Sequence, residues 1–154
     1  MVMNKAFTLV EVLVVVVILG ILAAVAIPRF AGATEEAKTS AVQSTVAGVR
    51  SAIASHRTAA VIAGDDPYPT LVELTDGTTI SFDIPTNPFT GVSGVQAVSR
   101  SQAMNRAVIN PGAAGWNYFV DNQSTPPIAI FYANADNETT VRDNTGSPLR
   151  ASEL

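Results

Sequence analysis

The pattern of hydrophobic and polar positions divides the chain into a long apolar run, an amphipathic stretch and a series of short alternating segments. From Phe7 to Ile27 the chain has 21 residues, of which only Thr8 and Glu11 are polar. As a helix rising about 1.5 Å per residue, this run would cross the roughly 30 Å hydrocarbon core of a membrane. The pattern therefore predicts a membrane-spanning helix with one ionisable side chain, Glu11.

An amphipathic stretch continues this helix beyond Pro28. Its apolar positions recur every three or four residues, which is typical of a helix with one buried face; they are Val42, Val46, Val49, Ile53, His56 and Ala60. Gly64 and the Asp65-Asp66-Pro67 that follows are a stop signal. We expect one helix from Phe7 to about Ala63, kinked near Val25 because Pro28 removes a backbone hydrogen bond and clashes with the preceding turn.

Beyond Gly64, alternating segments separated by Gly, Pro, Asn and Asp predict a small sheet. The expected strands are Thr79–Ile84, Gly115–Val120 and Ile128–Ala133, with a short edge at Val141–Asp143. The weakly periodic stretch between the first two predicts an exposed segment with one or two helical turns. The fold class is therefore α+β: a long kinked helix with a projecting apolar half, and an amphipathic half packed on a three- or four-stranded antiparallel sheet.

Composition and charge limit the classes of function. The chain has 154 residues, enough for one long helix and one modest globular part. It has 13 Asp and Glu against 9 Lys and Arg, a formal net charge of −4, so we expect no nucleic-acid partner. Because the chain has no cysteine, disulfides and thiolate metal sites are excluded.

Nothing in the sequence indicates an enzyme. His56, the only histidine, falls on the apolar stripe of the amphipathic helix, and no second His or Cys exists to complete a usual metal or nucleophile site. The chain also lacks a nucleophile elbow and a glycine-rich phosphate loop. We interpret His56 as a half-buried packing residue.

The N-terminus resembles that of type IV prepilins and of type II secretion pseudopilins. The resemblance rests on Lys5-Ala6-Phe7-Thr8-Leu9-Val10-Glu11, on the apolar run and on Pro28. It implies that a dedicated membrane peptidase cuts between Ala6 and Phe7, that the new N-terminus at Phe7 is methylated, and that Glu11 is the fifth mature residue. The family usually has Gly before the cut, whereas this chain has Ala6.

Physical chemistry gives Glu11 a compatible role. An ionised side chain within hydrocarbon costs at least about 2.5–3.5 kcal/mol and normally has a partner. Cleavage before Phe7 would create an ammonium about one helical turn away, in the same chain or in a neighbouring subunit. We interpret Glu11 as half of an assembly charge pair; the alternative is a glutamate close enough to the membrane surface to stay hydrated.

The resemblance implies a structural subunit of a filament. The chain would be a single-pass precursor in a bacterial-type inner membrane, with its N-terminus cytoplasmic, before it enters a periplasmic or extracellular filament. The implied partners are further copies of the chain, a prepilin peptidase/methyltransferase, an inner-membrane assembly platform and the lipid bilayer. Two alternatives remain: a major pseudopilin of a type II secretion or competence system and, more distantly, a membrane-anchored binding domain.

This interpretation divides the chain into four segments. Residues 1–6 are the leader, 7–28 the transmembrane and filament-core helix, and 29–63 the amphipathic helix. Residues 64–154 are a β-rich head packed on 40–63.

Calcium is the one ligand that the sequence suggests. The segments 85–91 and 115–118 loosely resemble a loop and strand of major pseudopilins, whose loops near the sheet can bind calcium. Aspartates offer the oxygen ligands that calcium prefers, and Asp83, Asp121 and Asp136 are the candidates here. The alternative is ordinary turn chemistry, in which Asp is common. No other cofactor is expected.

Overall fold

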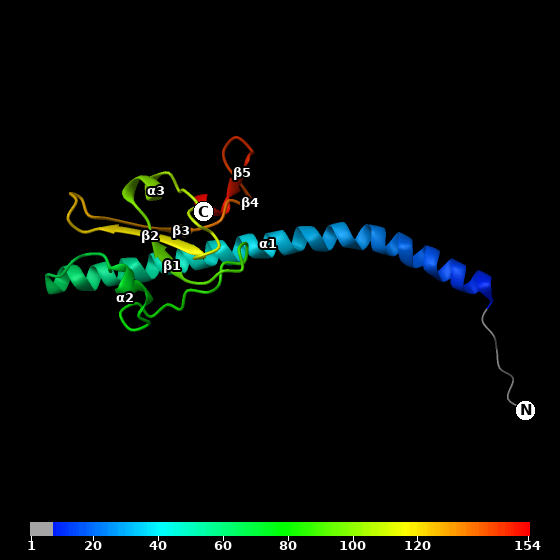
Figure 1. Cartoon of the computed structure of the whole chain (residues 1–154), viewed down its shortest axis with the longest axis horizontal. Coiled ribbons are helices and arrows are strands. Elements are labelled where there is room, and N and C mark those ends of the chain that lie inside the picture. Colours follow the sequence, from blue (N-terminus) through cyan, green and yellow to red (C-terminus); the bar gives the residue numbers. More distant parts are fainter. Residues whose placement is uncertain (1–7) are drawn as a thin grey trace, which may run out of the picture. The chain divides into compact units, whose positions relative to one another are not determined.

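The computed structural model describes residues 8–154, apart from the side chain of Ala31 (Figure 1). The predictions for Ala6 and Phe7 lie outside the described residues. The chain forms two compact units, one that ends at Glu35 and a globular unit from Glu36 to Leu154. A single helix, α1 (Leu9–Ala63), passes through both units.

Helix α1 has 55 residues and contains Pro28 without interruption, as predicted for a continuous helix. The kink near Val25 and the projection of the apolar half stay predictions. The helix ends where the stop signal indicated: Gly64 has a φ of 85°, and the Asp65 N–H donates to the carbonyl of Ala60 at 2.9 Å. Glycine is favoured at this position because it adopts the left-handed conformation that ends a helix without steric cost.

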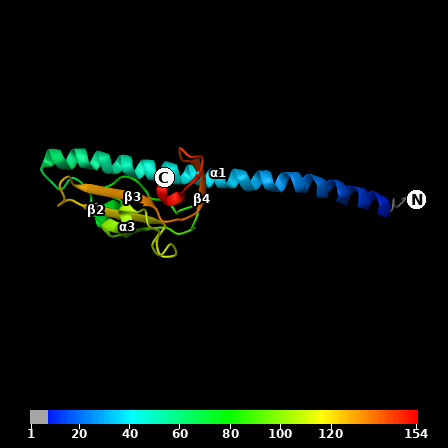
Figure 2. The same cartoon turned by 90° about the horizontal axis from the view of Figure 1, so that it is seen from above.

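A three-stranded sheet lies beside the second half of α1 (Figures 1 and 2). It contains β1 (Val95–Ala97), β2 (Trp116–Asp121) and β3 (Ile128–Ala133), in the order β1-β2-β3. β2 and β3 are antiparallel and match two predicted strands closely, whereas β1 is parallel to β2. The α+β class is therefore confirmed, but the expected antiparallel sheet is mixed.

Smaller elements complete the globular unit. Two short helices, α2 (Leu71–Thr75) and α3 (Arg100–Met104), flank β1 in the sequence. β4 (Glu138–Arg142) and β5 (Pro148–Arg150) form a separate antiparallel pair, and a 3₁₀ turn, η1 (Ala151–Glu153), follows. The short edge expected at 141–143 thus overlaps β4, and α3 lies within the segment for which one or two helical turns were expected.

The strand predicted at Thr79–Ile84 is wrong. This segment is irregular and pairs with no strand of the described chain. The alternation of its apolar and polar residues does match which side chains are buried and which are exposed. Ile80 is 2% exposed, while Thr79 and Ser81 face solvent. The Asp76 carboxylate accepts hydrogen bonds from the backbone N–H groups of Thr78 and Thr79, both at 2.8 Å, so a local turn bonds part of the backbone. The strand that pairs with β2 on the side away from β3 is β1 instead.

The core lies between the apolar stripe of α1 and one face of the sheet. Val42, Val46, Val49, Ile53 and Ala60 of the predicted stripe are at most 7% exposed. Trp116 of β2 and Phe131 of β3 cover the stripe, with ring centroids 5.5 Å apart. The Trp116 Nε1–H donates to the carbonyl of Pro85 at 2.8 Å, so the indole satisfies its one donor while buried.

The other face of the sheet is covered by α3 and the segment after it. Because side chains alternate along a strand, Asn117 and Tyr132 point away from α1. The Tyr132 hydroxyl donates to the carbonyl of Ala107 at 2.9 Å. Asn134, also fully buried, donates to the carbonyls of Ile109 and Ala114 at 2.7 and 2.8 Å. These hydrogen bonds from Tyr132 and Asn134 hold residues 105–114 against the sheet.

Candidate assembly site in the first part of α1

The first part of α1 exposes a continuous apolar surface. Its large apolar side chains between Leu9 and Phe30 are each from 49% to 81% exposed. Within the described chain, α1 is the one helix that is long and apolar enough to cross a membrane. Soluble monomers rarely expose apolar patches of this size, and such patches mark contacts with lipid or with protein. The apolar segment is therefore suited to contact with a membrane or with other protein.

Glu11 lies at the start of this surface and is held by Thr8. The Thr8 backbone N–H and hydroxyl both donate to Oε2 of Glu11, at 2.9 and 2.8 Å, and the Glu11 N–H donates to the Thr8 hydroxyl at 3.3 Å. With α1 beginning at Leu9, this reciprocal pair is a capping box. Thr8 and Glu11 together satisfy backbone donors that the first turn of a helix leaves free.

The capping box leaves part of the Glu11 carboxylate available. Both hydrogen bonds from Thr8 end on Oε2, and no residue of the described chain bonds Oε1. An ionised carboxylate is an acceptor with two oxygens, so Oε1 can still accept a hydrogen bond from an ammonium. The sequence signal for this arrangement is the Thr-x-x-Glu spacing of residues 8–11. We had interpreted Glu11 only as a charge-pair residue and did not predict the capping box.

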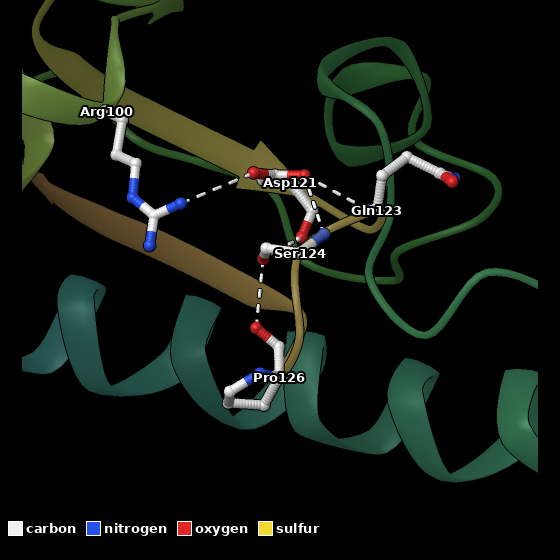
Figure 3. A network of polar contacts seen from close by, with 5 residues as sticks. All are labelled: Arg100, Asp121, Gln123, Ser124 and Pro126. Carbon is white, nitrogen blue, oxygen red and sulfur yellow. Dashed lines mark hydrogen bonds and ion pairs between the residues drawn. The ribbon is translucent and has the colours of Figure 1, made fainter.

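The three candidate calcium ligands are not brought together as one cluster. Figure 3 shows Asp121 at the end of β2, where its carboxylate accepts from the N–H groups of Gln123 and Ser124, each at 3.1 Å. A guanidinium nitrogen of Arg100 lies 3.7 Å from the same carboxylate. This arrangement orders the turn between β2 and β3.

Asp136 and Asp83 occupy other surroundings. Asp136 pairs with Arg150 at 2.6 Å, and Asp83 is exposed in the irregular segment before Pro85. No group of three or more His, Asp or Glu side chains in the described residues is placed to hold a metal ion. Calcium binding therefore stays a prediction without support from the geometry.

His56 lies on the stripe of α1 at the position that the periodicity indicated. It is half-buried, and its Nδ1 atom has no hydrogen-bond partner among the described residues. The side chains that line the two grooves beside it contribute three carboxylates but no second histidine. A packing role for His56 stays a prediction.

Comparison with known proteins agrees with the chemistry of this segment. Residues 1–27 match the family described as the prokaryotic N-terminal methylation motif. The matched residues include Glu11 and the exposed apolar run up to Ile27, and they define a prepilin-type N-terminal segment. The chain is also similar to the type IV narrow pilus major component PilA5 of Thermus thermophilus, with 52% identity over 50 residues.

The similarity is confined to part of each protein. It covers 32% of this chain and 43% of the Thermus protein, so the chain matches less than half of that relative's length. No solved structure matches the chain. Over the residues that match, the motif and the relative both support a relation to type IV pilins.

Proposed function

We propose that this chain is the structural subunit of a type IV pilus-like filament. It is made as a membrane-inserted prepilin, cleaved before Phe7, methylated on the new N-terminus and polymerised through the first part of α1. One observation carries the proposal: the exposed apolar helix, most of whose apolar run lies within the matched methylation motif, has a single carboxylate in its first turn.

Glu11 favours a filament over a membrane tether. In a helix that only anchors a domain, the Glu11 carboxylate would serve capping alone, which a neutral Gln could also provide without the cost of a charge near hydrocarbon. In a filament, the Phe7 ammonium of a neighbouring chain can meet Oε1 of Glu11 while Thr8 keeps Oε2 occupied. Apolar helices would then cover one another, and the charge pair would set their axial stagger.

The proposed precursor is a single-pass protein of a bacterial-type inner membrane with a cytoplasmic N-terminus. A prepilin peptidase/methyltransferase would process it there, and an inner-membrane assembly platform would move it from lipid into a periplasmic or extracellular filament. A major pseudopilin would share every one of these steps. The similarity to a subunit named as a major component of a type IV narrow pilus favours the pilus.

The first test is the intact mass and N-terminal peptide of the protein recovered from its native membrane and from sheared filaments. We expect a chain that begins at Phe7 and carries one added methyl group. A chain in both fractions that keeps residues 1–6 would contradict processing. Ala6→Leu should block the cut, because the peptidase requires a small residue there if the resemblance holds.

The second test separates charge pairing from helix capping. Glu11→Val should allow membrane insertion and cleavage but abolish filaments, because the ammonium loses its partner. Thr8→Val is the matched control: it removes the capping hydroxyl, which costs about 1 kcal/mol of helix stability, but keeps the carboxylate. Filament yield after shearing is the measurement, and a normal yield from Glu11→Val would refute the charge-pair account.

A further inference from the structure

A basic groove lies between α1 and the outer edge of β3. It has a volume of about 260 Å³, and three of its lining residues are arginines: Arg50 and Arg57 from α1, and Arg106 from the segment after α3. Apolar side chains such as Ile53 and Ile130 form the rest of its wall. We call this site the arginine groove. It gathers three of the nine Lys and Arg residues of an acidic chain.

These arginines have no side-chain carboxylate as partner within the described residues. Arg50 and Arg106 both donate to the carbonyl of Phe131, at long distances of 3.3 and 3.5 Å, and Arg50 also donates to the Leu154 carbonyl at 2.9 Å. The Arg57 guanidinium lies over the ring of Tyr68, 5.2 Å from its centroid. Each guanidinium has five N–H donors, so most of these donors are left for another acceptor.

The positive charges also act on one another. Desolvation, followed by the charge of Arg106, lowers the pKa of Arg50. Arg106 lines a second groove with Asp136 and Glu153, but Arg150 engages both of these carboxylates, through its guanidinium and its backbone N–H. An anion in the arginine groove would therefore relieve the repulsion between the guanidinium groups of Arg50 and Arg106.

A complementary acidic groove lies near the end of α1. It has a volume of about 460 Å³; Asp65, Asp66 and Glu73 line it, and no Lys or Arg is among the described residues around it. Asp65 and Asp66 are exposed, and their carboxylates have no hydrogen-bond or ion-pair partner in the described chain. They follow the C-terminus of α1, whose partial negative charge makes an added cation favourable.

The two grooves open on different flanks of α1. At about 100° per residue, Arg50 and Arg57 lie about 20° apart around the helix, whereas the residues of α1 that line the acidic groove, from His56 to Ala63, lie about 60–180° from them. The buried stripe runs between them. The α1 residues that line the acidic groove are also centred about 9 Å further along the helix, at about 1.5 Å per residue. One copy therefore presents the two surfaces on different sides and at different heights.

We propose that the arginine groove receives the acidic turn Asp65-Asp66 of a neighbouring copy of this chain. Such a contact joins two different surfaces, so each copy can bind one neighbour through its arginines and another through its aspartates. Contacts of this kind produce open helical filaments when the rotation does not close a ring. The inference rests on the proposed filament function and adds a contact between globular units to the packing of apolar helices.

The test is charge reversal in the full-length chain, with filament yield as the measurement. Arg57→Glu and Asp66→Arg should each reduce yield at least about tenfold, because close charge pairs at interfaces couple strongly. The double variant should recover yield to within about threefold of the unsubstituted chain. Arg142→Glu is the control: it makes the same charge change at an exposed residue whose guanidinium bonds the Gly146 carbonyl.

Each outcome separates the contact from the filament function. Normal yields from both single variants would overturn the contact but leave the filament proposal standing, provided that Glu11→Val still abolishes assembly. Losses that the double variant does not restore would also overturn the contact. A failure to fold would not be rescued by the second substitution, so rescue identifies a true pair. An unsubstituted chain that forms no filament would overturn both proposals.

Cross-linking gives an independent measurement, because the chain has no cysteine of its own. Filaments containing both Arg57→Cys and Asp66→Cys chains, treated with a short bismaleimide cross-linker because an Arg–Asp contact holds Cα atoms further apart than a disulfide spans, should give a linked dimer that contains one copy of each variant. Filaments made from either variant alone should not, since like positions do not meet in the proposed contact. Equal cross-linking in single-variant filaments, or none in the mixed ones, would overturn the assignment.

Discussion

The two parts of α1 share one backbone geometry but bury their apolar residues in different ways. From Val12 to Val17, consecutive apolar side chains around the whole helix are 49–60% exposed. In the globular unit, Val42, Val46 and Val49 form one stripe and are at most 1% exposed. The first part has no cover within its own unit, whereas the second is covered by β2 and β3.

This difference shows that the two parts of α1 depend on different contacts for the burial of their apolar side chains. The second part of α1 is stabilised by its own sheet, so its substitutions should change the unfolding of the globular unit. The first part needs lipid or other chains to cover it, so its substitutions should change insertion or assembly. Substitutions before the boundary near Glu35 should therefore change insertion or assembly, and those after it should change the unfolding of the globular unit.

The largest effect is expected from Trp116→Ala. Trp116 is fully buried, stacks on Phe131 and bonds the Pro85 carbonyl, so truncation should lower the free energy of unfolding of the globular unit by about 3–5 kcal/mol. Urea unfolding of the full chain in detergent, followed by near-UV circular dichroism of its tyrosines, measures this change. Helical signal from the first part of α1 should persist after the globular unit has unfolded.

Val72→Ala is the control for this experiment, because Val72 is apolar but 74% exposed on α2. It should change the unfolding midpoint little. Complete loss of helical signal in a single transition would break the comparison, since the two parts of α1 would then unfold together.

A smaller effect within one helix compares Val42→Ala with Val15→Ala. Val42 is fully buried, so the loss of two carbons should cost about 2–3 kcal/mol of globular-unit stability. Val15 is 54% exposed, and its truncation should leave that unfolding free energy unchanged. The same urea titration measures both variants. Equal destabilisation would show that the first part of α1 also stabilises the globular unit.

Much of the fold could be predicted because its strongest signals are periodic. The spacing of Val42, Val46, Val49 and Ile53 specified the buried face of α1, and Gly64 specified its end. Alternation specified β2 and β3 almost to the residue. These signals depend on local geometry and burial, which a single sequence records directly.

Pairing partners were harder to predict, since they depend on distant residues. The alternation from Thr79 to Ile84 reflects burial against α1 and not a strand, because β1 occupies the place beside β2. β1 itself has only three residues and no clear alternation. The arginine groove also escaped prediction, because Arg106 joins Arg50 and Arg57 only through the fold.

The candidate assembly site was predicted in its residues but not in its hydrogen bonds. Glu11 stood out because it interrupts an apolar run, and its role as a charge partner stays a prediction. Thr8 was considered only as a polar residue, although its spacing from Glu11 is that of a capping box. Ala6 and Phe7 lie outside the described residues, so cleavage and methylation must be tested chemically.

The smallest expected effect concerns acid sensitivity, which should belong to the globular unit. Hydrogen bonds from the Thr79 hydroxyl and from the N–H groups of Thr79 and Thr78 hold the pKa of Asp76 well below its usual value. Such a group stabilises the folded state above the ordinary Asp pKa of about 3.9, and this contribution is lost as the pH falls toward the folded pKa. Unfolding midpoints measured from about pH 5 to pH 2 should therefore fall.

Asp76→Asn should make that fall shallower, because an amide does not titrate in this range. The effect should be modest, since Asp76 is exposed to solvent. Asp83→Asn is the matched control, at an exposed aspartate whose carboxylate accepts no hydrogen bond from the described residues. An identical pH profile for Asp76→Asn and the unsubstituted chain would show that this turn does not couple protonation to folding. Neither substitution should change the helical signal from the first part of α1. The acid response would then belong to the globular unit, which begins at Glu36.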